Sequence, residues 1–489
     1  MRLLWIFLLA LAGCAAAPVD GLQKIDTIVV IYAENRSFDH LYGLFPGAEG
    51  IAQASAEQKT QLDHDGRPLA SLPPVWGAGG KPDPRLPTAG LPNGPFRLDA
   101  PPISRRWDEV LPSPWHLYYQ NIEQINGGRN NMFVAMGNVG AWVMAYVDGS
   151  QMRMWKWAQD YTLADHFFMG AFGGSYLNHQ WLVCACTPRD PGAPDSAKAT
   201  LEGGKLKQRP DSPASVMHGP VHVMDGRISP DGYTVNTSQP PYQPSGIPPA
   251  SEKEKEFADP ARHPVPPLRD KTIGDTLSAK GVSWAWYAGG YRQALADGTQ
   301  DPKVKRSVIY TRADNSPNFQ PHHQPFNYYA RFAPGTADRA KHLKDYDDLV
   351  ADIDKGTLPQ VVFYKPAGRL TQHPSYTDLA SGDEHLNELL LKLRSSPQWP
   401  RMAIVVTYDE NGGFWDHVAP PSGPGWGDRW GPGTRIPAIV VSPFARRGYV
   451  DKTPYDTTSV LKLITRRFGL EPLPGVRANM GDLSNAFSF

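Results

Sequence analysis

The sequence is poor in cysteine, balanced in charge and almost free of long apolar runs. Three cysteines in 489 residues are too few for the disulfide framework of a small secreted domain. Lys plus Arg number 49, as do Asp plus Glu, so we expect no nucleic-acid partner. Beyond the first residues no apolar stretch is long enough to span a bilayer, so we expect a protein that is at most anchored to a membrane.

The first residues indicate an export signal. Arg2 supplies the positive end, and residues 3–12 form an apolar segment too short to cross a bilayer. The segment ends in Leu-Ala-Gly-Cys, with Cys14 placed as in a bacterial lipobox; cleavage within residues 15–17 is the alternative. We predict a signal peptide over residues 1–13, a lipid anchor at Cys14, and an exported protein that is a periplasmic or outer-membrane lipoprotein or is secreted.

One domain with two insertions is predicted over residues 23–489. Residues 50–110 and 187–270 are rich in Pro and lack regular periodicity, which is typical of ordered insertions or partly mobile loops. Elsewhere, predicted strands alternate with predicted helices, the helix at 383–393 being capped by Ser381 or Asp383. The strands cover residues 25–31, 282–287, 360–364, 402–407 and 436–441, and the helices cover 275–280, 383–393 and 457–468. This alternation predicts an α/β fold with a mostly parallel central sheet and helices on both faces.

Two of the predicted strands end in acidic and amide side chains. Glu34 and Asn35 follow the first strand, and Asp409 and Glu410 follow the strand at 402–407. Because the carboxyl ends of parallel strands share one edge, we expect these four residues to converge. With no balancing lysine foreseen, three carboxylates would repel one another, and a divalent metal ion of uncertain identity would relieve that repulsion. A single acidic residue at the end of one strand is more often structural and does not by itself indicate a metal site.

Ser175 stands at the start of a predicted helix. Two glycines precede it in AFGGSYLNHQW (residues 171–181), and an apolar helical pattern follows. Free N–H groups at a helix N-terminus favour an anion, and beside a metal the hydroxyl could become a nucleophile. A plain N-cap serine is the alternative. His179, four residues on, is on the same helix face and either supports the site or is simply packed.

Several histidines occupy loops rich in proline, where packed core histidines are unusual. They are His116, His322, His323 and His373. Such residues could line a phosphate pocket or supply an acid for a leaving group, although each taken alone is more often structural. Asp416 and His417 could ligate a metal or rigidify their loop. Cys184 and Cys186 have a spacing that is poor for a mutual disulfide, so we expect buried thiols.

Four segments together resemble a known family. They are ENRSFD (residues 34–39), FGGS (172–175), DGYTVNT (231–237) and YDENGGFWDH (408–417). From about residue 25 onward the chain resembles the phosphoesterase family of bacterial acid phosphatases and phospholipases C, which has an alkaline-phosphatase-like fold. The setting of Ser175 is similar to that in the acid phosphatase branch.

The resemblance implies a mechanism. The metal ligands would be Glu34, Asn35, Ser175, Asp409 and Glu410, and the phosphate-binding histidines would be His116, His322, His323 and His373. Ser175 would attack phosphorus in line, and water would then hydrolyse the phosphoserine. A histidine would protonate the leaving oxygen, which implies an acid pH optimum.

The main expectation is an acid phosphatase that hydrolyses phosphorylated small molecules. The first alternative is a phospholipase C-type phosphodiesterase acting on phospholipid head groups. The second is a binding lipoprotein without turnover, which would tolerate Ser175→Ala. A sulfatase is disfavoured because Ser175 lacks the Cys/Ser-x-Pro-x-Arg signature. The oligomeric state stays open.

Overall fold

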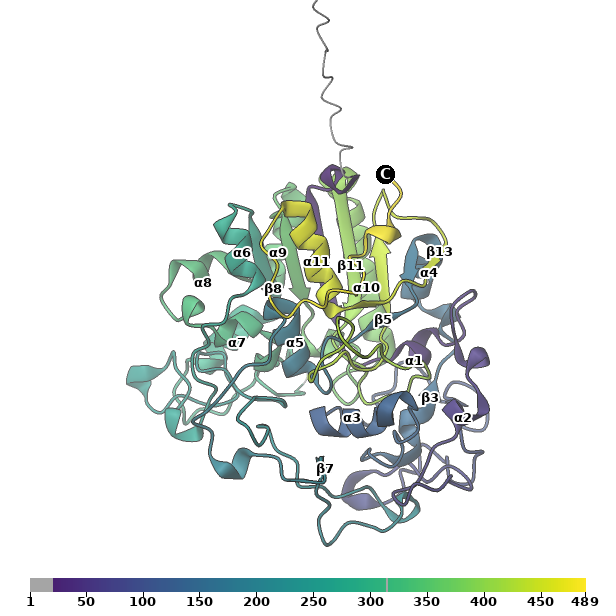
Figure 1. The fold of residues 1–489 in the computed structure, drawn as a ribbon. Coiled ribbons are helices and arrows are strands. Elements are labelled where there is room, and N and C mark those ends of the chain that lie inside the picture. The colour runs from purple at the N-terminus through teal and green to yellow at the C-terminus, as the bar shows by residue number, and fades with distance from the viewer. Residues whose placement is uncertain (1–20, 314) are drawn as a thin grey trace, which may run out of the picture.

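The computed structural model describes residues 21–313 and 315–489 (Figure 1). The predicted signal peptide and Cys14 lie outside these described residues. Within the described part, the largest sheet has eight strands. Their spatial order is β13 (Tyr449–Asp451), β4 (Thr162–Ala164), β12 (Ala438–Val441), β11 (Met402–Tyr408), β1 (Thr27–Ala33), β10 (Val361–Lys365), β8 (Trp284–Ala288) and β9 (Leu343–Asp345).

The sheet is mostly parallel, as predicted. Strand β12 runs antiparallel to β11 and β4, and the other neighbouring pairs in this sheet are parallel. All seven residues of β1 are buried, which explains its continuous apolar sequence. Strand β12 begins at Ala438, two residues later than predicted, because Pro437 has no N–H to donate to the ladder.

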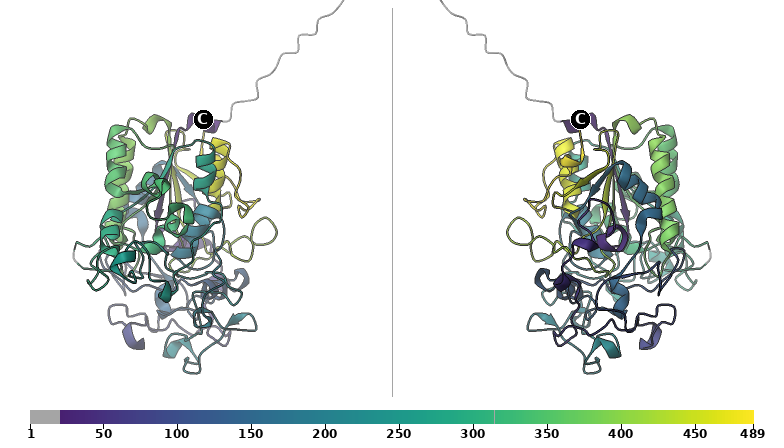
Figure 2. Two further views of the ribbon diagram at one scale, coloured as in Figure 1. Left: turned by 90° about the vertical axis from the view of Figure 1, so that its left-hand side faces the viewer. Right: turned by 90° about the vertical axis from the view of Figure 1, so that its right-hand side faces the viewer.

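Helices cover both faces of the sheet, which makes the fold α/β. Seen along the sheet, α11 lies on one side and α10 on the other (Figure 2). The helices are α1 (Phe38–Tyr42), α2 (Ala56–Lys59), α3 (Tyr118–Ile125), α4 (Arg153–Asp160), α5 (Ser175–Cys184), α6 (Ile273–Ala279), α7 (Tyr291–Gly298), α8 (Ala337–His342), α9 (Tyr346–Lys355), α10 (Leu379–Arg394) and α11 (Thr457–Phe468).

Two helix boundaries test the predicted capping. The helix α11 has the predicted bounds, with Asp456 as N-cap and Gly469 in the left-handed conformation at its end. The cap predicted for α10 is wrong. Its N-cap is Asp378, whose carboxylate accepts a hydrogen bond from Ser381 N at 2.7 Å, so Ser381 and Asp383 lie inside the helix.

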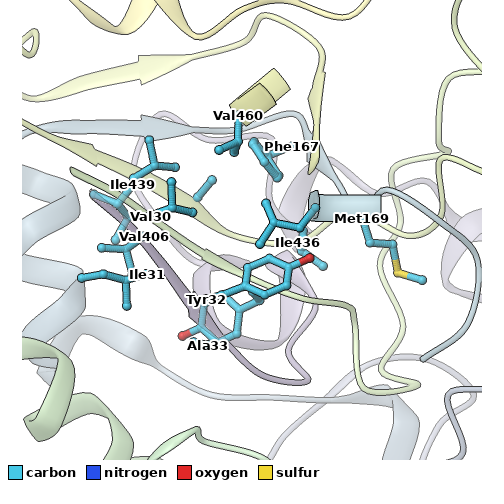
Figure 3. Packing of buried hydrophobic residues seen from close by; sticks show 14 of the residues in the cluster. Val30, Ile31, Tyr32, Ala33, Phe167, Met169, Val406, Ile436, Ile439 and Val460 are labelled. Atoms are coloured by element: carbon cyan, nitrogen blue, oxygen red, sulfur yellow. The ribbon is translucent and has the colours of Figure 1, made fainter. Parts of the chain in front are cut away.

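The core around the middle of the sheet is densely aliphatic. Figure 3 shows Val30 of β1 on the side of the sheet that Val460 of α11 covers. Val406 of β11 and Ile439 of β12 pair with each other in register with Ile31, so they lie on the other side. Each such side chain contributes roughly 1.5–3 kcal/mol when fully buried. This packing holds the carboxyl ends of β1 and β11 in a fixed relation.

The two Pro-rich segments predicted as insertions gather at the end of the sheet where β1 finishes (Figure 1). They carry short pairs of strands, and their buried side chains, such as Leu72 and Val216, belong to the same hydrophobic cluster as the sheet. The minor strand pairs are β2 (Phe96–Arg97) with β3 (Ala145–Tyr146), β5 (Phe167–Phe168) with β14 (Tyr455–Asp456), and β6 (Leu201–Glu202) with β7 (Lys205–Leu206).

The expectation of free thiols is wrong, because Cys184 and Cys186 form a disulfide. The intervening Ala185 has φ 48° and reverses the chain at the end of α5. The two Cα atoms thereby come within 5.1 Å, a normal separation for a disulfide. In the described residues, no helix combines the length and the apolar character needed to cross a membrane.

Candidate active site

Glu34 and Asp409 lie side by side because their strands are paired in register. Ala33 at the end of β1 is opposite Tyr408 at the end of β11, so the next residue of each strand carries a carboxylate at the same edge. Both carboxylates are fully buried. Asp409 Oδ1 accepts hydrogen bonds from the backbone N–H groups of Asn35 at 3.1 Å and Glu410 at 2.8 Å. The predicted convergence of these residues is therefore present.

Glycines allow the loop after β11 to approach the loop after β1. Asn35 itself has φ 62°, and Gly412 packs against it. A Cβ at Gly412 would come within 2.3 Å of the Asn35 carbonyl oxygen, so a larger residue would push the two loops apart. The N–H of Gly412 also donates to Glu410 Oε2, which fixes that carboxylate.

A lysine balances the acidic residues, contrary to expectation. Lys365 is the last residue of β10 and is buried. Its Nζ lies 3.2 Å from Glu34 Oε1 and 3.9 Å from Asp409 Oδ2. The rule that placed the acids at this edge also applies to the strand predicted at 360–364, whose next residue is this lysine. The sequence therefore carries a signal for Lys365 that the prediction overlooked.

Ser175 is the first residue of α5, and Gly174 is the N-cap without any side-chain bond, so the N-cap alternative is wrong. Asn178 shapes the preceding turn, since its side chain bonds both the N–H and the C=O of Ala171 at 2.9 and 3.1 Å. The Ser175 hydroxyl donates to Glu410 Oε1 at 3.5 Å. The serine thus faces the carboxylates from the first turn of α5, where N–H groups have no partner within the helix.

The glycines before Ser175 let a histidine approach it. A Cβ at Gly174 would lie 2.7 Å from the carbonyl oxygen of His116. His116 Nε2 lies 3.7 Å from Glu410 Oε1 and 3.3 Å from Asn35 Nδ2. Its side chain is 21% exposed, whereas that of Glu410 is 0% exposed. His116 therefore lies between solvent and the buried carboxylates.

The other predicted histidines also reach the site. His323 Nε2 lies 2.6 Å from Glu34 Oε1. The His322 ring centroid is 4.2 Å from that of His323, and the His373 centroid is 5.5 Å from that of His116. His179 stacks on His323 at 4.9 Å and its Nδ1 donates to the Ser175 carbonyl at 2.7 Å, so it buttresses both.

Unused oxygen atoms mark where a cation fits. Oε2 of Glu34, Oδ1 of Asn35 and Oδ2 of Asp409 are buried and make no hydrogen bond within the described residues. Within the same residues, Glu34 Oε1 has only its contacts with His323 and Lys365. Glu34, His323 and Asp409 each offer a ligand atom, and these atoms lie within 4.8 Å of one another. Oxygen and imidazole donors suit a borderline divalent ion. The residues present thus fit the predicted metal, with His323 as a candidate ligand that the sequence had assigned to phosphate.

The carboxylates have opposite electrostatic surroundings. Burial alone would raise the pKa of Glu34, but the charges of His323 and Lys365 hold it well below its usual range. Burial raises the pKa of Asp409 to about 7 against the charge of Lys365, and burial with the charge of Asp409 raises the pKa of Glu410. The surroundings of Glu34 thus favour its ionised form, whereas those of Asp409 and Glu410 favour the protonated form.

The four predicted phosphate-binding histidines have lowered pKa values. Burial lowers the pKa of His116 and His322, that of His323 to about 4 and that of His373 to about 3. Neutral imidazoles accept protons, so these values do not favour the imidazolium that the expected acid optimum needs.

Asp416 and His417 belong to a second buried cluster, organised by an arginine. Arg435 Nε donates to Asp416 Oδ1 at 2.9 Å, and Arg435 Nη2 donates to Asp39 Oδ1 at 3.1 Å. His417 Nδ1 lies 2.6 Å from Asp39 Oδ2. These contacts join helix α1, which follows β1, to the loop after β11, so the second alternative, rigidity, is the one that the geometry supports.

The DGYTVNT segment supports the site from outside. Asn236 Oδ1 accepts from the N–H of Tyr118 at the start of α3, at 2.9 Å. Thr234 Oγ1 is 2.8 Å from Tyr176 Oη in α5. The segment therefore fixes the two helices that carry His116 and Ser175 at or near their starts.

A family model described as the Phosphoesterase family matches residues 25–471. The chain belongs to this family. It is 27% identical to a non-hemolytic phospholipase C of Burkholderia pseudomallei, over 98% of this chain and 61% of that protein, so the chain spans about three fifths of that relative. It is 25% identical to Phospholipase C B of Mycobacterium tuberculosis, over 97% of this chain and 80% of the relative.

Among solved structures, a protein of the alkaline phosphatase superfamily from Vibrio parahaemolyticus matches with a TM-score of 0.34 and 10% identity. The match covers 80% of this chain and 76% of that one.

Proposed function

We propose that the chain is a metal-dependent phosphoesterase of the phospholipase C type, which cleaves phosphodiesters through a phosphoserine. The observation that carries the proposal is the Ser175 hydroxyl, which faces buried oxygens without hydrogen bonds at the N-terminus of α5. The expected acid phosphatase activity is the runner-up, because the relatives reported above are phospholipases C.

The residues of this chain have distinct tasks in the proposed reaction. Glu34, Asn35, Asp409 and His323 would hold the metal, and Ser175 and Glu410 lie beside them. When bound, a divalent cation would supply Lewis acidity that lowers the pKa of the Ser175 hydroxyl and offsets charge on the phosphoryl oxygens. The first-turn N–H groups of α5 would receive one of these oxygens.

Proton transfer can run along contacts already present. Ser175 Oγ gives its proton to Glu410 Oε1, 3.5 Å away, and forms a bond to phosphorus. His116 Nε2, 3.7 Å from that oxygen, is placed to pass the proton to the leaving oxygen as its bond to phosphorus breaks. His116 Nδ1 is directed at the Pro114 carbonyl at 2.8 Å, which leaves Nε2 as the reactive nitrogen. Water then hydrolyses the phosphoserine.

The proposal is tested by comparing a diester with a monoester. Hydrolysis of short-chain phosphatidylglycerol, a diester with an uncharged head group, and of p-nitrophenyl phosphate would be measured with and without chelator. We expect faster diester cleavage, its loss in chelator, and a drop of roughly 10³-fold or more in Ser175→Ala. Ser251→Ala is the matched control, because Ser251 is exposed and lies in an insertion.

Each outcome of these assays supports a different function. Faster monoester turnover would return the assignment to acid phosphatase. Turnover that survives in Ser175→Ala would remove the phosphoserine. Absence of turnover with any divalent metal would leave the binding lipoprotein.

A further inference from the structure

Two loops that carry site histidines are held by contacts with distant segments of the chain. In one insertion, Gln239 donates to Tyr310 Oη at 2.8 Å, and Tyr310 Oη in turn lies 2.8 Å from His322 Nδ1. Next to the end of the other insertion, the carbonyl of Leu111 accepts a hydrogen bond of 2.8 Å from the N–H of Ser375, which ties down the loop after His373. These contacts hold the two loops at the mouth of the site, one through the insertion at 187–270 and the other through Leu111.

A ladder of rings leads from the carboxylates to this mouth. The His116 and His373 centroids are 5.5 Å apart, and Tyr376 stacks on His373 at 3.8 Å with an interplanar angle of 12°. Arg312 lies over the outer part of the ladder, with its guanidinium carbon 5.3 Å from the Tyr376 centroid. The charges of Glu34 and Glu410 add to burial in raising the pKa of Tyr376 to about 12, which places this ring within the field of the metal site.

Arg312 is an exposed cation with unused hydrogen-bonding capacity. One of its nitrogens, Nη2, donates to Ser375 Oγ at 3.4 Å. Among residues 21–313 and 315–489, the contacts of its side chain are this hydrogen bond and the face of Tyr376. A guanidinium presents five N–H donors in a planar fork that matches a carboxylate or phosphate.

We propose that Arg312, on its Tyr376 platform, binds an anionic group on the organic part of the phosphate ester. The inference rests on the proposed phosphoesterase function and specifies its substrate class as esters that carry a carboxylate or a second phosphate near the scissile group. Tyr376 sets the position of the guanidinium, and Gln239 and Leu111 help to hold the two loops.

The same geometry disfavours a quaternary ammonium. An aromatic face can attract a cationic head group, but the face of Tyr376 is already occupied by Arg312. A second cation there would meet the like charge of the guanidinium. The mouth of the site therefore favours substrates that carry an anionic group over substrates that carry a cationic one.

The test uses two pairs of esters that differ by one carboxylate. The diester pair is short-chain phosphatidylserine and phosphatidylethanolamine below their micellar concentrations, and the monoester pair is phosphoserine and phosphoethanolamine. We expect a higher kcat/KM for the serine ester of the pair that is turned over. In Arg312→Gln this ratio should fall by about fivefold at low salt, the size expected for one partly exposed charge contact. The effect should shrink as ionic strength rises.

Lys305→Gln is the control, because it removes the same charge from an exposed position of the same loop. An unchanged ratio in Arg312→Gln, with turnover intact, would overturn the subsite and leave the phosphoesterase proposal standing. Without turnover of any ester, the proposed function fails. In that case, calorimetry of phosphoserine and phosphoethanolamine binding to the metal-loaded protein gives the ratio of their Kd values. The change of this ratio in Arg312→Gln then decides whether the subsite exists.

Discussion

Two buried acidic clusters lie at the same edge of the sheet and differ in how their charge is satisfied. The Arg435 cluster consists of Asp39, Asp165, Asp416 and His417 around Arg435. The metal-site cluster consists of Glu34, Asn35, Asp409 and Glu410. In the first, donors from the protein reach every carboxylate oxygen. In the second, Glu34 Oε2 and Asp409 Oδ2 make no hydrogen bond in the described part of the chain.

The contrast distinguishes a cluster that stabilises the fold from a cluster that can bind a cation. A buried carboxylate without donors is costly, and proteins keep such groups where a ligand completes them. In the metal-site cluster Lys365 supplies one positive charge against three carboxylates. In the other, the planar fork of Arg435 reaches three carboxylates at once. Acidic residues alone therefore do not define a metal site, whereas their unused oxygens do.

Removing the arginine should have the largest effect. Arg435→Met leaves Asp39, Asp165 and Asp416 buried without their shared partner, so we expect a loss of about 3–5 kcal/mol in the free energy of unfolding. Urea denaturation followed by fluorescence measures this loss. Arg435→Lys, which keeps the charge without the fork, should fall between the unmodified protein and Arg435→Met. A loss below about 1 kcal/mol in Arg435→Met would show that the cluster is not structural.

The metal-site cluster should respond to a cation instead. Adding Mn²⁺ or Zn²⁺ to chelator-treated protein should raise Tm, because a ligand at about 100 times its Kd stabilises by about 2.7 kcal/mol. We expect this shift to disappear in Glu34→Gln, which keeps the shape of the side chain and removes its charge. Differential scanning fluorimetry is a sufficient measurement.

Asp416→Asn is the matched control for that experiment. It also changes one buried carboxylate into an amide, but at a residue whose oxygens already have donors. Its baseline Tm should fall while the metal-induced shift remains. A shift that is lost in both variants would erase the distinction between the clusters.

Much of the metal-site cluster could be predicted because its residues follow strands. Glu34 and Asp409 come directly after apolar runs, and parallel pairing then dictates that they meet. The same reasoning, applied to β10, would have found Lys365. The Arg435 cluster has no such signal. Its members come from separate segments around residues 39, 165, 416 and 435, and only tertiary packing joins them.

Local backbone conformation explains a second limit. The disulfide between Cys184 and Cys186 depends on Ala185 adopting φ 48°, a conformation that alanine rarely takes. Nothing in the sequence indicates it. Conversely, glycines such as Gly412 mark positions where side chains would clash, and the sequence shows them directly.

The contribution of His417 to the stability of the Arg435 cluster should depend on pH. Burial lowers the pKa of His417, but the hydrogen bond and the charge of Asp39 outweigh it and raise the pKa above its ordinary value. The stabilisation is therefore full below about pH 6.5, the usual pKa of histidine, and is lost as pH rises through the folded-state value. We expect His417→Gln to cost about 1.5–3 kcal/mol at pH 6 and less at pH 9, measured by urea denaturation at both values. An equal cost at both would mean that the proton on His417 plays no part.

We expect the smallest effect on stability for an arginine–aspartate pair that is exposed to solvent. Arg429 binds Asp231 through two hydrogen bonds of 2.6 and 2.7 Å, a geometry as good as that around Arg435, but both side chains are 48% exposed. The hydrogen bond with Arg429 lowers the pKa of Asp231, so its stabilisation is present above about pH 3.8 and is lost as pH falls through the folded-state value. Water and salt screen this pair, and a double-mutant cycle with Asp231→Asn and Arg429→Gln should give a coupling of about 0.2–1 kcal/mol that declines in high salt. A coupling as large as the loss in Arg435→Met would contradict the claim that burial, rather than ion-pair geometry, makes the Arg435 cluster structural.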